Sequence, residues 1–410
     1  MIESGPQQSA AITRNFSATK AAIVAFAALL GLVSPVHSQT VQVSAPHAVL
    51  MDMSTGSILF SRGADEALQP ANMTKLLTLA VVFDELKRGT ITLDTEFPVS
   101  NHAWRTGGAP SGASTMFAAV RSRIRVEDLI IGAAVVSGND AAIILAEGIA
   151  GSEQAFAKRM NDFAARLDLK SARFFNPTGA QHDDQRISVR DLAKVAAHLI
   201  REHPDHYKYF KVPDLTWSKI KQSNRNPLLG SSLGVDGFVT GSTKESGYGY
   251  VASAEQDGRR LIVVVHGAKS DKDRTEDARR LLDWGFKAFS DRLLFTGANE
   301  IAHASVYGGA KGSVALVGKS DVHLLSLQGT NERLIARVVY EGPLRAPIIK
   351  GAEVAKLRVF RGDQLAYETA LYAAEDVPAG GVFGRAFDAV YEYVAGLIRA
   401  GVRKVLTRNS

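Results

Sequence analysis

Three short segments combine side chains that can exchange protons or make hydrogen bonds. Asn72-Met73-Thr74-Lys75 places a lysine three residues after an asparagine, and Ser137-Gly138-Asn139 and Val239-Thr240-Gly241 follow further along the chain. Residues three apart on a helix share one face, so the amine of Lys75 can reach the side chain at position 72. Burial lowers the pKa of a lysine because it disfavours the ammonium form, which allows the amine to act as a base near neutral pH. These segments are the candidates for the chemistry of the chain.

The elements that must position these segments change from strand to helix and back to strand. We predict a β-hairpin at the start of this region, then a series of helices, then two strands before the last helix. The hairpin joins 47–53 to 57–61, the helices cover 73–88, 126–136, 141–149, 153–167, 188–201 and 273–288, and the strands cover 248–254 and 261–266. Asn72 therefore begins the first long helix, Ser137 to Asn139 joins two buried helices, and Val239 to Gly241 precedes a strand. This order predicts an α/β sandwich whose helical half is inserted between parts of one sheet.

The pattern changes from about residue 295. Short alternating runs at 313–317, 322–326, 334–340 and 353–360 are divided by Gly, Pro and Asn. Such runs predict a small all-β domain. We find no catalytic constellation in its sequence.

Composition excludes several classes of protein. At about 150 residues per domain, 410 residues correspond to two or three folded units. The absence of cysteine excludes a disulfide scaffold, thiolate metal sites and cysteine catalysis. The ten histidines show no HExxH or other ligand-spaced cluster, so we expect no metal site, and nothing in the sequence calls for a cofactor. A formal net charge of +6 suits an anionic membrane or polymer surface better than dedicated nucleic acid binding.

The first 38 residues are typical of an export signal. Arg14 and Lys20 precede an apolar and small run from Ala21 to Val33, and Val36-His37-Ser38 offers a cleavage site. The run would span about 20 Å as a helix, too short for a bilayer core of about 30 Å. We predict a signal peptide over 1–38, with an uncleaved short anchor as the alternative.

The last residues of the chain predict an amphipathic helix. From Gly380 onward five basic residues stand against two acidic ones. The apolar positions step by three or four and trace one helical face: Phe383, Phe387, Val390, Val394, Leu397, Gly401 and Val405. This pattern indicates a helix lying on an anionic membrane surface, and a helix packing back on the protein has the same pattern.

The three segments occupy the places of SxxK, SxN and KTG in the penicillin-recognising serine enzymes. In their order, spacing and flanks, residues 45–290 resemble the serine D-Ala-D-Ala carboxypeptidases, the low-molecular-weight penicillin-binding proteins. The stretches that support the resemblance are Asn101-His-Ala-Trp-Arg-Thr-Gly-Gly108, Ser137-Gly-Asn-Asp-Ala-Ala142, Leu145-Ala-Glu147, Phe175-Asn-Pro-Thr-Gly179, Asn224-Arg-Asn226 and Asp283-Trp-Gly-Phe286. The resemblance implies a β-lactamase/transpeptidase-like α/β domain over 39–290, a small β-rich domain over 291–378 and an amphipathic membrane-associating helix over 379–410.

The resemblance also implies a role for each segment. Lys75 would be the base that takes the proton of a nucleophilic hydroxyl, Ser137 would relay protons to and from the leaving group, and Asn139 would hold the substrate amide. In the family the lysine of KTG supplies positive charge and its strand pairs with an extended peptide, and Val239-Thr240-Gly241 occupies that place. The alternatives are that Lys75 is a surface cation and that Ser137 to Asn139 is a helix cap.

Substrate binding is implied for a second set of residues. The backbone N–H groups of Asn72 and Ser242 would hold an oxyanion, and Arg225 and Arg274 would bind the carboxylate of D-alanine. Both arginines also fit the description of ordinary surface charges. The ligands implied are peptidoglycan stem peptides and, as non-covalent ligands, β-lactams.

Two positions depart from the family pattern. Position 72 holds asparagine instead of the nucleophilic serine, and an amide nitrogen conjugated with its carbonyl is no useful nucleophile. Position 239 holds valine instead of lysine. Thr74 lies about 200° around the helix from position 72 and would point away. Asn72 as a helix N-cap fits an inactive site.

Three hypotheses about function follow. The chain is a protein that recognises D-Ala-D-Ala stem peptides in peptidoglycan metabolism with little or no acylation, or it is an active carboxypeptidase that removes the terminal D-Ala. A β-lactamase or esterase on the same fold is the third, and it too would need the missing hydroxyl. We expect an exported, periplasmic protein held at the inner membrane surface by its tail, with no nucleic acid partner.

Overall fold

The computed structural model describes residues 41–297, 299–329, 334–362 and 364–381. The predicted signal peptide over 1–38 and nearly all of the predicted tail helix over 379–410 lie outside the described residues. Within the described ranges, no helix is both long enough and apolar enough to cross a membrane.

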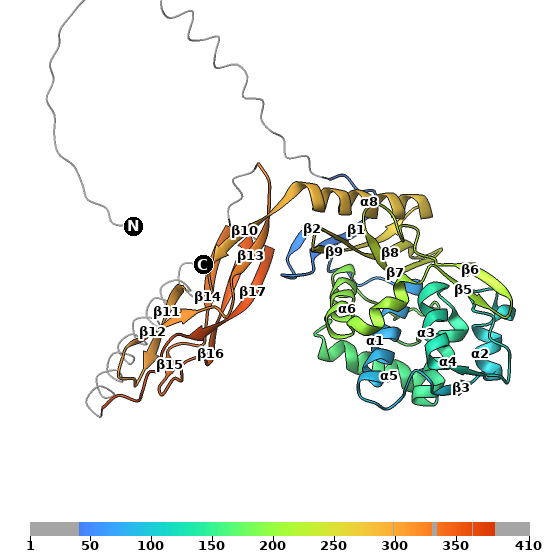
Figure 1. Ribbon diagram of the computed structural model, residues 1–410, viewed down its shortest axis with the longest axis horizontal. Helices are drawn as coiled ribbons and strands as arrows, with labels where there is room; N and C mark the ends of the chain where they lie inside the picture. Colours follow the sequence, from blue (N-terminus) through green and yellow to red (C-terminus); the bar gives the residue numbers. More distant parts are fainter. Residues whose placement is uncertain (1–40, 298, 330–333, 363, 382–410) are drawn as a thin grey trace, which may run out of the picture. The chain divides into compact units, whose positions relative to one another are not determined.

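One five-stranded sheet forms the centre of the first domain (Figure 1). Its strand order is β2-β1-β9-β8-β7, with every neighbouring pair antiparallel. The strands are β1 His47–Asp52, β2 Ile58–Arg62, β7 Val235–Thr243, β8 Gly247–Gln256 and β9 Arg259–Ala268. The chain leaves this sheet after β2 and returns at β7, which confirms the predicted insertion of a helical half between parts of one sheet.

The helical half lies on one face of the sheet and a single long helix covers the other (Figure 1). The principal helices are α1 Lys75–Lys87, α3 Val126–Val135, α4 Asn139–Ala150, α5 Glu153–Arg166, α6 Val189–Glu202 and α8 Asp271–Ala288. Side chains alternate between the two faces of a strand. In β1, Val49 and Met51 join the core with α1 and α6, whereas Ala48 and Leu50 join the core with α8.

Short elements connect the helices. They are η1 Ala71–Thr74, α2 Asn101–Thr106, η2 Ala109–Ser111, α7 Pro204–Tyr207 and η3 Lys208–Lys211, with the strand pairs β3 Glu96–Pro98 with β4 Arg123–Arg125 and β5 Asp214–Trp217 with β6 Ile220–Ser223. The predicted helix over 73–88 is thus a 3₁₀ turn followed by α1. Asn72 lies inside that turn, and Pro70 occupies the N-cap position, so the interpretation of Asn72 as N-cap was wrong.

Residues from 289 onward form the predicted all-β domain. A six-stranded sheet has the order β14-β16-β17-β12-β11-β15, and β10 pairs with β13. The strands are β10 Phe289–Phe295, β11 Glu300–Tyr307, β12 Ser313–Val317, β13 Val322–Leu327, β14 Leu334–Val339, β15 Leu344–Arg345, β16 Glu353–Arg361 and β17 Gln364–Ala373. Alternate residues of β16, among them Ala355, Leu357 and Val359, are buried in a core of their own.

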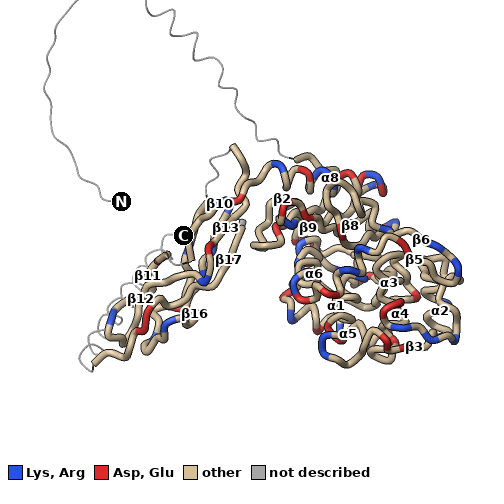
Figure 2. Tube along the Cα trace, in the orientation of Figure 1, with Lys and Arg blue, Asp and Glu red and all other residues tan. Residues whose placement is uncertain are grey.

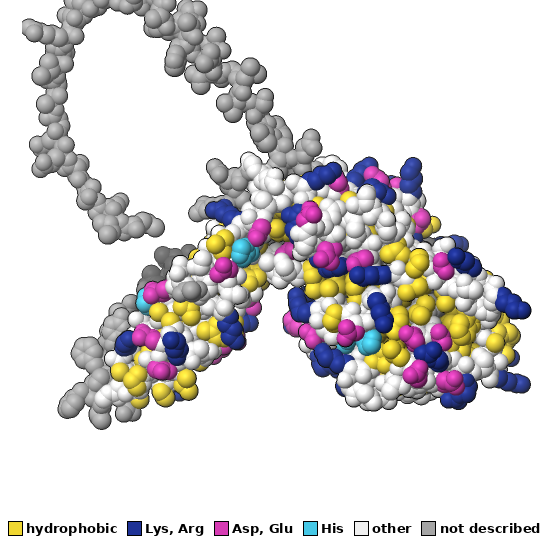
Figure 3. Space-filling model, in the orientation of Figure 1, with side chains coloured by type: hydrophobic (Ala, Val, Ile, Leu, Met, Phe, Trp, Pro, Cys, Tyr) yellow, Lys and Arg dark blue, Asp and Glu magenta, His cyan; other side chains and the backbone are white. Residues whose placement is uncertain are grey.

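Charged side chains of both signs are interspersed along the described trace (Figure 2). The face drawn in Figure 3 likewise carries acidic and basic groups next to each other, between hydrophobic patches. Ion pairs within one helix include Arg280 with Glu276 and Lys287 with Asp283 in α8. Exposed pairs of this kind contribute little to stability, so the buried contacts determine it.

Asp277 in α8 joins the segment before β1 to the domain. Its buried carboxylate accepts hydrogen bonds from the backbone N–H groups of Ser44 and Ala45 and from Ser44 Oγ at 2.8 to 3.0 Å. Replacing the carboxylate of Asp277 by an amide removes one acceptor oxygen, so at least one of these buried donors loses its hydrogen bond. We predict that Asp277→Asn lowers the free energy of unfolding by about 2 kcal/mol in urea denaturation followed by tryptophan fluorescence. The exposed Asp283→Asn in the same helix is the control and should change it by less than about 0.5 kcal/mol.

Candidate active site

Lys75 is the first residue of α1, and its side chain is fully buried. Its Nζ donates a hydrogen bond to Asn72 Oδ1 at 3.1 Å and another to the backbone carbonyl of Thr178 at 2.8 Å. The prediction that positions 72 and 75 share one face is therefore confirmed by a direct contact. The alternative of a surface cation at Lys75 was wrong.

The amine of Lys75 has the electrostatics of a base. Burial lowers its pKa from the ordinary 10.5 to about 7, and the negative charge of Asp140 opposes part of this change. The charged and neutral forms are thus both populated near neutral pH. An unprotonated amine at this position can accept a proton from a hydroxyl, but the side chain at position 72 is an amide and has no hydroxyl.

The turn that carries Asn72 is tightly enclosed by backbone on two sides. At Gly241 in β7, an added Cβ would lie 2.8 Å from the backbone nitrogens of both Asn72 and Met73. At Gly179, where φ is +85°, an added Cβ would lie 1.7 Å from the carbonyl oxygen of Ala71. Only glycine permits backbone to approach this closely. The strand β7 and the loop ending at Gly179 therefore fix the position of η1.

Ser137 and Asn139 lie between α3 and α4. Ser137 is buried and adopts φ +56°, an uncommon conformation for a residue with a side chain. Its Oγ, like Asn139 Oδ1, is a buried polar atom with no hydrogen-bond partner in the described protein. The N-cap of α4 is Gly138, so this segment does begin the helix, but no side chain makes a capping hydrogen bond. Two buried polar atoms here are therefore free to make further hydrogen bonds.

Asp140, which sequence reasoning did not single out by itself, holds the loop opposite these residues. Its two carboxylate oxygens accept hydrogen bonds from Thr115 Oγ1 at 2.6 Å and from the backbone N–H groups of Met116 and Ala118 at 2.9 and 3.0 Å. The residue is fully buried. It therefore both shapes the loop and supplies the negative charge felt by Lys75. The only sequence signal was its place directly after Asn139.

Val239, Thr240 and Gly241 lie inside β7, so the expectation that they precede a strand was wrong. Val239 is buried in the core of the helical half and pairs with Val251. Thr240 Oγ1 contacts the carbonyl oxygen of Arg225 at 3.5 Å. Ser242, opposite Tyr248, is exposed. The first position of this segment thus carries a buried apolar side chain.

The two arginines differ in their surroundings. Arg225 is exposed, and its backbone N–H donates to the carbonyl of Val135, two residues before Ser137. Arg274 is buried, and its Nη1 donates to the carbonyls of Gly241 and Gly249 at 3.2 Å while Nη2 pairs with Asp271. Burial lowers the pKa of Arg274 from its ordinary high value. Backbone contacts thus connect both residues to the strand or loop that carries the candidate site.

Thr74 is not placed to act as a nucleophile beside Lys75. It is fully buried, and its Oγ1 accepts a hydrogen bond from Gln185 Nε2 at 3.3 Å. The amine of Lys75 makes its contacts with Asn72 and Thr178 instead.

Comparison with known proteins gives a family for this chain. The sequence profile of the D-alanyl-D-alanine carboxypeptidases matches residues 34–270, and that of the C-terminal domain of penicillin-binding protein 5 matches residues 289–379. The chain belongs to the D-alanyl-D-alanine carboxypeptidase family. The resemblance inferred from the three segments is confirmed.

Individual members of the carboxypeptidase family are similar over nearly the whole chain. The D-alanyl-D-alanine carboxypeptidase DacA of Haemophilus influenzae is 36% identical over 360 residues, which are 87% of this chain and 91% of that protein. DacC of Escherichia coli is 37% identical over 83% of this chain and 86% of its own. The crystal structure of penicillin-binding protein 5 from Haemophilus influenzae aligns with a TM-score of 0.71 at 36% identity, covering 82% of this chain and 98% of that one. The carboxypeptidase fold, an α/β domain followed by an all-β domain, is therefore shown.

The buried amine predicts how stability depends on pH. Lys75 has a folded-state pKa near 7 and an ordinary value of 10.5 when unfolded, so between these values the unfolded chain binds more protons. Stability conferred through this group therefore rises with pH in that window, by up to about 1.4 kcal/mol per pH unit. We predict that the free energy of unfolding of the parent chain, minus that of Lys75→Met, increases from pH 7 to pH 10 in denaturant titrations. Parallel curves for the two proteins would contradict a buried, neutral amine.

Proposed function

We propose that this chain recognises peptidoglycan stem peptides ending in D-Ala-D-Ala and holds them with little or no acylation. The observation that carries the proposal is the hydrogen bond from Lys75 Nζ to Asn72 Oδ1. In this pair the base faces an amide oxygen, an acceptor without a proton. Covalent catalysis by the family's route needs a hydroxyl at this place, and loss of such a nucleophile costs several orders of magnitude in rate.

The replacement at position 239 supports the same conclusion. Valine there is packed in a hydrophobic core, so no positive charge is offered from this strand position. An electrostatic contribution to stabilising negative charge in a transition state would thereby be lost. Two changes, one at the nucleophile and one at the cation, reduce acylation while leaving the strand and the turn in place.

Ligand recognition is supported by what the chain retains. Ser137 Oγ and Asn139 Oδ1 have no hydrogen-bond partner in the described protein, and Arg225 is exposed beside Thr240. We assign Ser137, Asn139, Thr240, Gly241 and Ser242 to binding of the peptide, and Arg225 and Arg274 to its terminal carboxylate. A guanidinium suits a carboxylate because it donates two parallel hydrogen bonds.

An active D-Ala-D-Ala carboxypeptidase is the second candidate. The pKa of Lys75 near 7 favours it, because a base of this kind is what proton abstraction requires.

We further propose that the chain is exported to the periplasm and that residues 379–410 hold it at the inner membrane surface. β-Lactams would bind to the same cleft without forming an adduct.

The first test is covalent labelling. Purified protein incubated with a fluorescent penicillin should show no stoichiometric adduct by intact-protein mass spectrometry, because no hydroxyl faces Lys75. An adduct on any residue, or release of free D-alanine from a pentapeptide at rates comparable with active relatives, would overturn the proposal.

Restoring the two family residues tests the same explanation from the other side. Asn72→Ser combined with Val239→Lys should gain penicillin labelling by at least about 100-fold over the parent, because the hydroxyl would occupy the place of Asn72 Oδ1 near the amine of Lys75. Asn72→Ala with Val239→Lys is the matched control and should remain unlabelled. Equal silence of both variants would show that the two positions do not explain the lack of acylation.

Binding without turnover has its own measurement. Calorimetry with an L-Lys-D-Ala-D-Ala tripeptide should show heat of binding, and Arg225→Ala or Arg274→Ala should weaken the affinity by about 10-fold to 100-fold, as expected for losing a hydrogen bond to a charged group. The same tripeptide with an amidated C-terminus should bind the parent as weakly as the acid binds the variants. Absence of heat with the parent would refute ligand recognition.

A further inference from the structure

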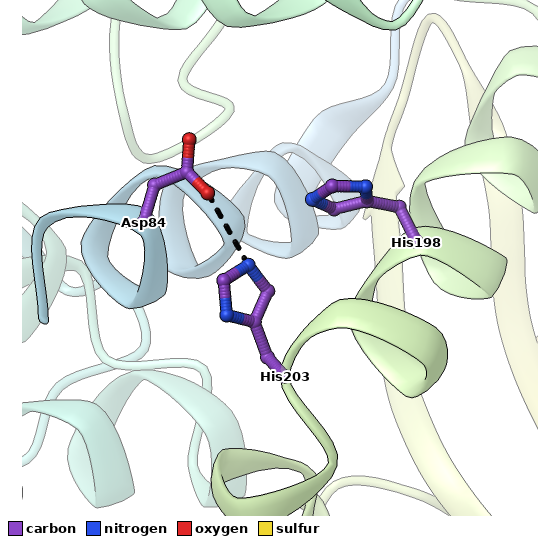
Figure 4. A group of neighbouring side chains, drawn as sticks. All are labelled: Asp84, His198 and His203. Carbon is purple, nitrogen blue, oxygen red and sulfur yellow. Dashed lines mark ion pairs between the residues drawn. The ribbon is translucent and has the colours of Figure 1, made fainter. Parts of the chain in front are cut away.

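A cluster of two histidines and an aspartate lies at the far end of α1 from Lys75. Asp84 belongs to the last turns of α1, His198 to α6, and His203 to the residue directly after α6 (Figure 4). One ligand atom from each lies within 4.8 Å of the others. The fold thus brings Asp84 next to two histidines that lie more than 100 residues later in the sequence, so the sequence alone does not group the three residues.

The separations are close to what a zinc-type ion requires. Zn²⁺ bound tetrahedrally at 2.0 to 2.1 Å places its ligand atoms about 3.4 Å apart. Asp84 Oδ1 and His203 Nε2 are 3.3 Å apart. His198 points a ring nitrogen toward the space beside them (Figure 4).

One imidazole nitrogen of this cluster has no partner among the described residues. His198 Nε2 is a buried atom without a hydrogen-bond partner in the described protein. His203, only 3% exposed as a residue, pairs through Nε2 with Asp84 Oδ1. Buried polar atoms are nearly always satisfied, so the unpartnered nitrogen of His198 beside this pair calls for a partner. A divalent cation would provide it and bind His203 and Asp84 as well, because an imidazole nitrogen offers a lone pair when its ring is neutral.

Surrounding residues hold the ligands in place and leave one carboxylate oxygen open. Arg166 contacts Asp84 Oδ2 at 2.7 Å, and Arg88 lies 3.9 Å from the same oxygen, so Oδ1 is the one turned to the histidines. Phe163 packs edge-on against the ring of His198, and Phe83 packs against that of His203, with centroids 5.2 and 5.8 Å apart. Fixed rings and a hydrogen-bonded carboxylate are the support that metal ligands usually receive.

We propose that Asp84 Oδ1, His198 Nε2 and His203 Nε2 bind one zinc-type divalent cation, with a water completing a tetrahedral shell. Two imidazoles and one carboxylate suit Zn²⁺, Ni²⁺ and Co²⁺ better than Ca²⁺ or Mg²⁺. The cation would join the C-terminal end of α1 to the end of α6. Its role is structural, since the cluster lies at the opposite end of α1 from Lys75, and it does not depend on the function proposed above.

The test is a Zn²⁺ titration of the untagged chain after treatment with a chelator. A competing chromophoric indicator should report one ion per chain, and the melting temperature should rise with added Zn²⁺ because the ion binds the folded state. His198→Phe keeps a ring against Phe163 but removes the nitrogen, and should weaken binding by at least about 100-fold. His206→Phe is the matched control, because His206 also packs on Phe83 but is outside the cluster, and it should bind as the parent does.

A second measurement needs no variant. Co²⁺ added to the parent chain should give the intense visible absorption of a tetrahedral ion, and Zn²⁺ should abolish it. In ¹⁵N-detected histidine spectra, two of the ten imidazoles should shift on addition of Zn²⁺. The proposal is overturned by an absorption typical of hydrated Co²⁺ alone, by unshifted histidines, or by equal Zn²⁺ affinity in the parent and His198→Phe.

Discussion

The candidate site depends on one constraint, which is that a buried lysine amine must find hydrogen-bond acceptors. One side-chain oxygen and one backbone carbonyl serve this purpose. Lys75 can be accommodated in the core because Asn72 Oδ1 and the Thr178 carbonyl accept its protons and because its pKa has fallen to about 7. An amine buried without such acceptors would destabilise the fold. The turn η1, the loop before Gly179 and the strand β7 are placed around this one group.

The backbone around the candidate site accommodates both Asn72 and Val239. Gly241 approaches the turn closely, Ser137 has an uncommon backbone conformation, and Asp140 is a buried carboxylate. Asn72 accepts a hydrogen bond from Lys75, and Val239 packs in a core. The carboxypeptidase fold is therefore compatible with an asparagine at position 72 and a valine at position 239.

Local patterns predicted much of this, and contacts between distant residues could not be predicted. Helical spacing placed positions 72 and 75 on one face, and the alternation of strands and helices indicated the inserted helical half. The sequence patterns did not predict β7 as a strand. Gly237 and Gly241 interrupt its pattern, and glycine weakens strand propensity. The Thr178 carbonyl is a backbone atom from 103 positions away, and no residue type marks it in the sequence. The grouping of Asp84 with His198 and His203 likewise depends on how α1 packs against α6.

The position of β7 at the end of its sheet has a consequence for solubility. A terminal strand has backbone groups that no further strand satisfies, and such edges tend to recruit strands from other molecules into aggregates. The residues of β7 from Gly237 to Gly241 are nevertheless buried, and η1 and η3 contact this strand. Ser242, next to the last residue of β7, is exposed, so little of the strand is open to a strand from another molecule. The burial of β7 therefore lowers the tendency of the folded protein to aggregate through this edge.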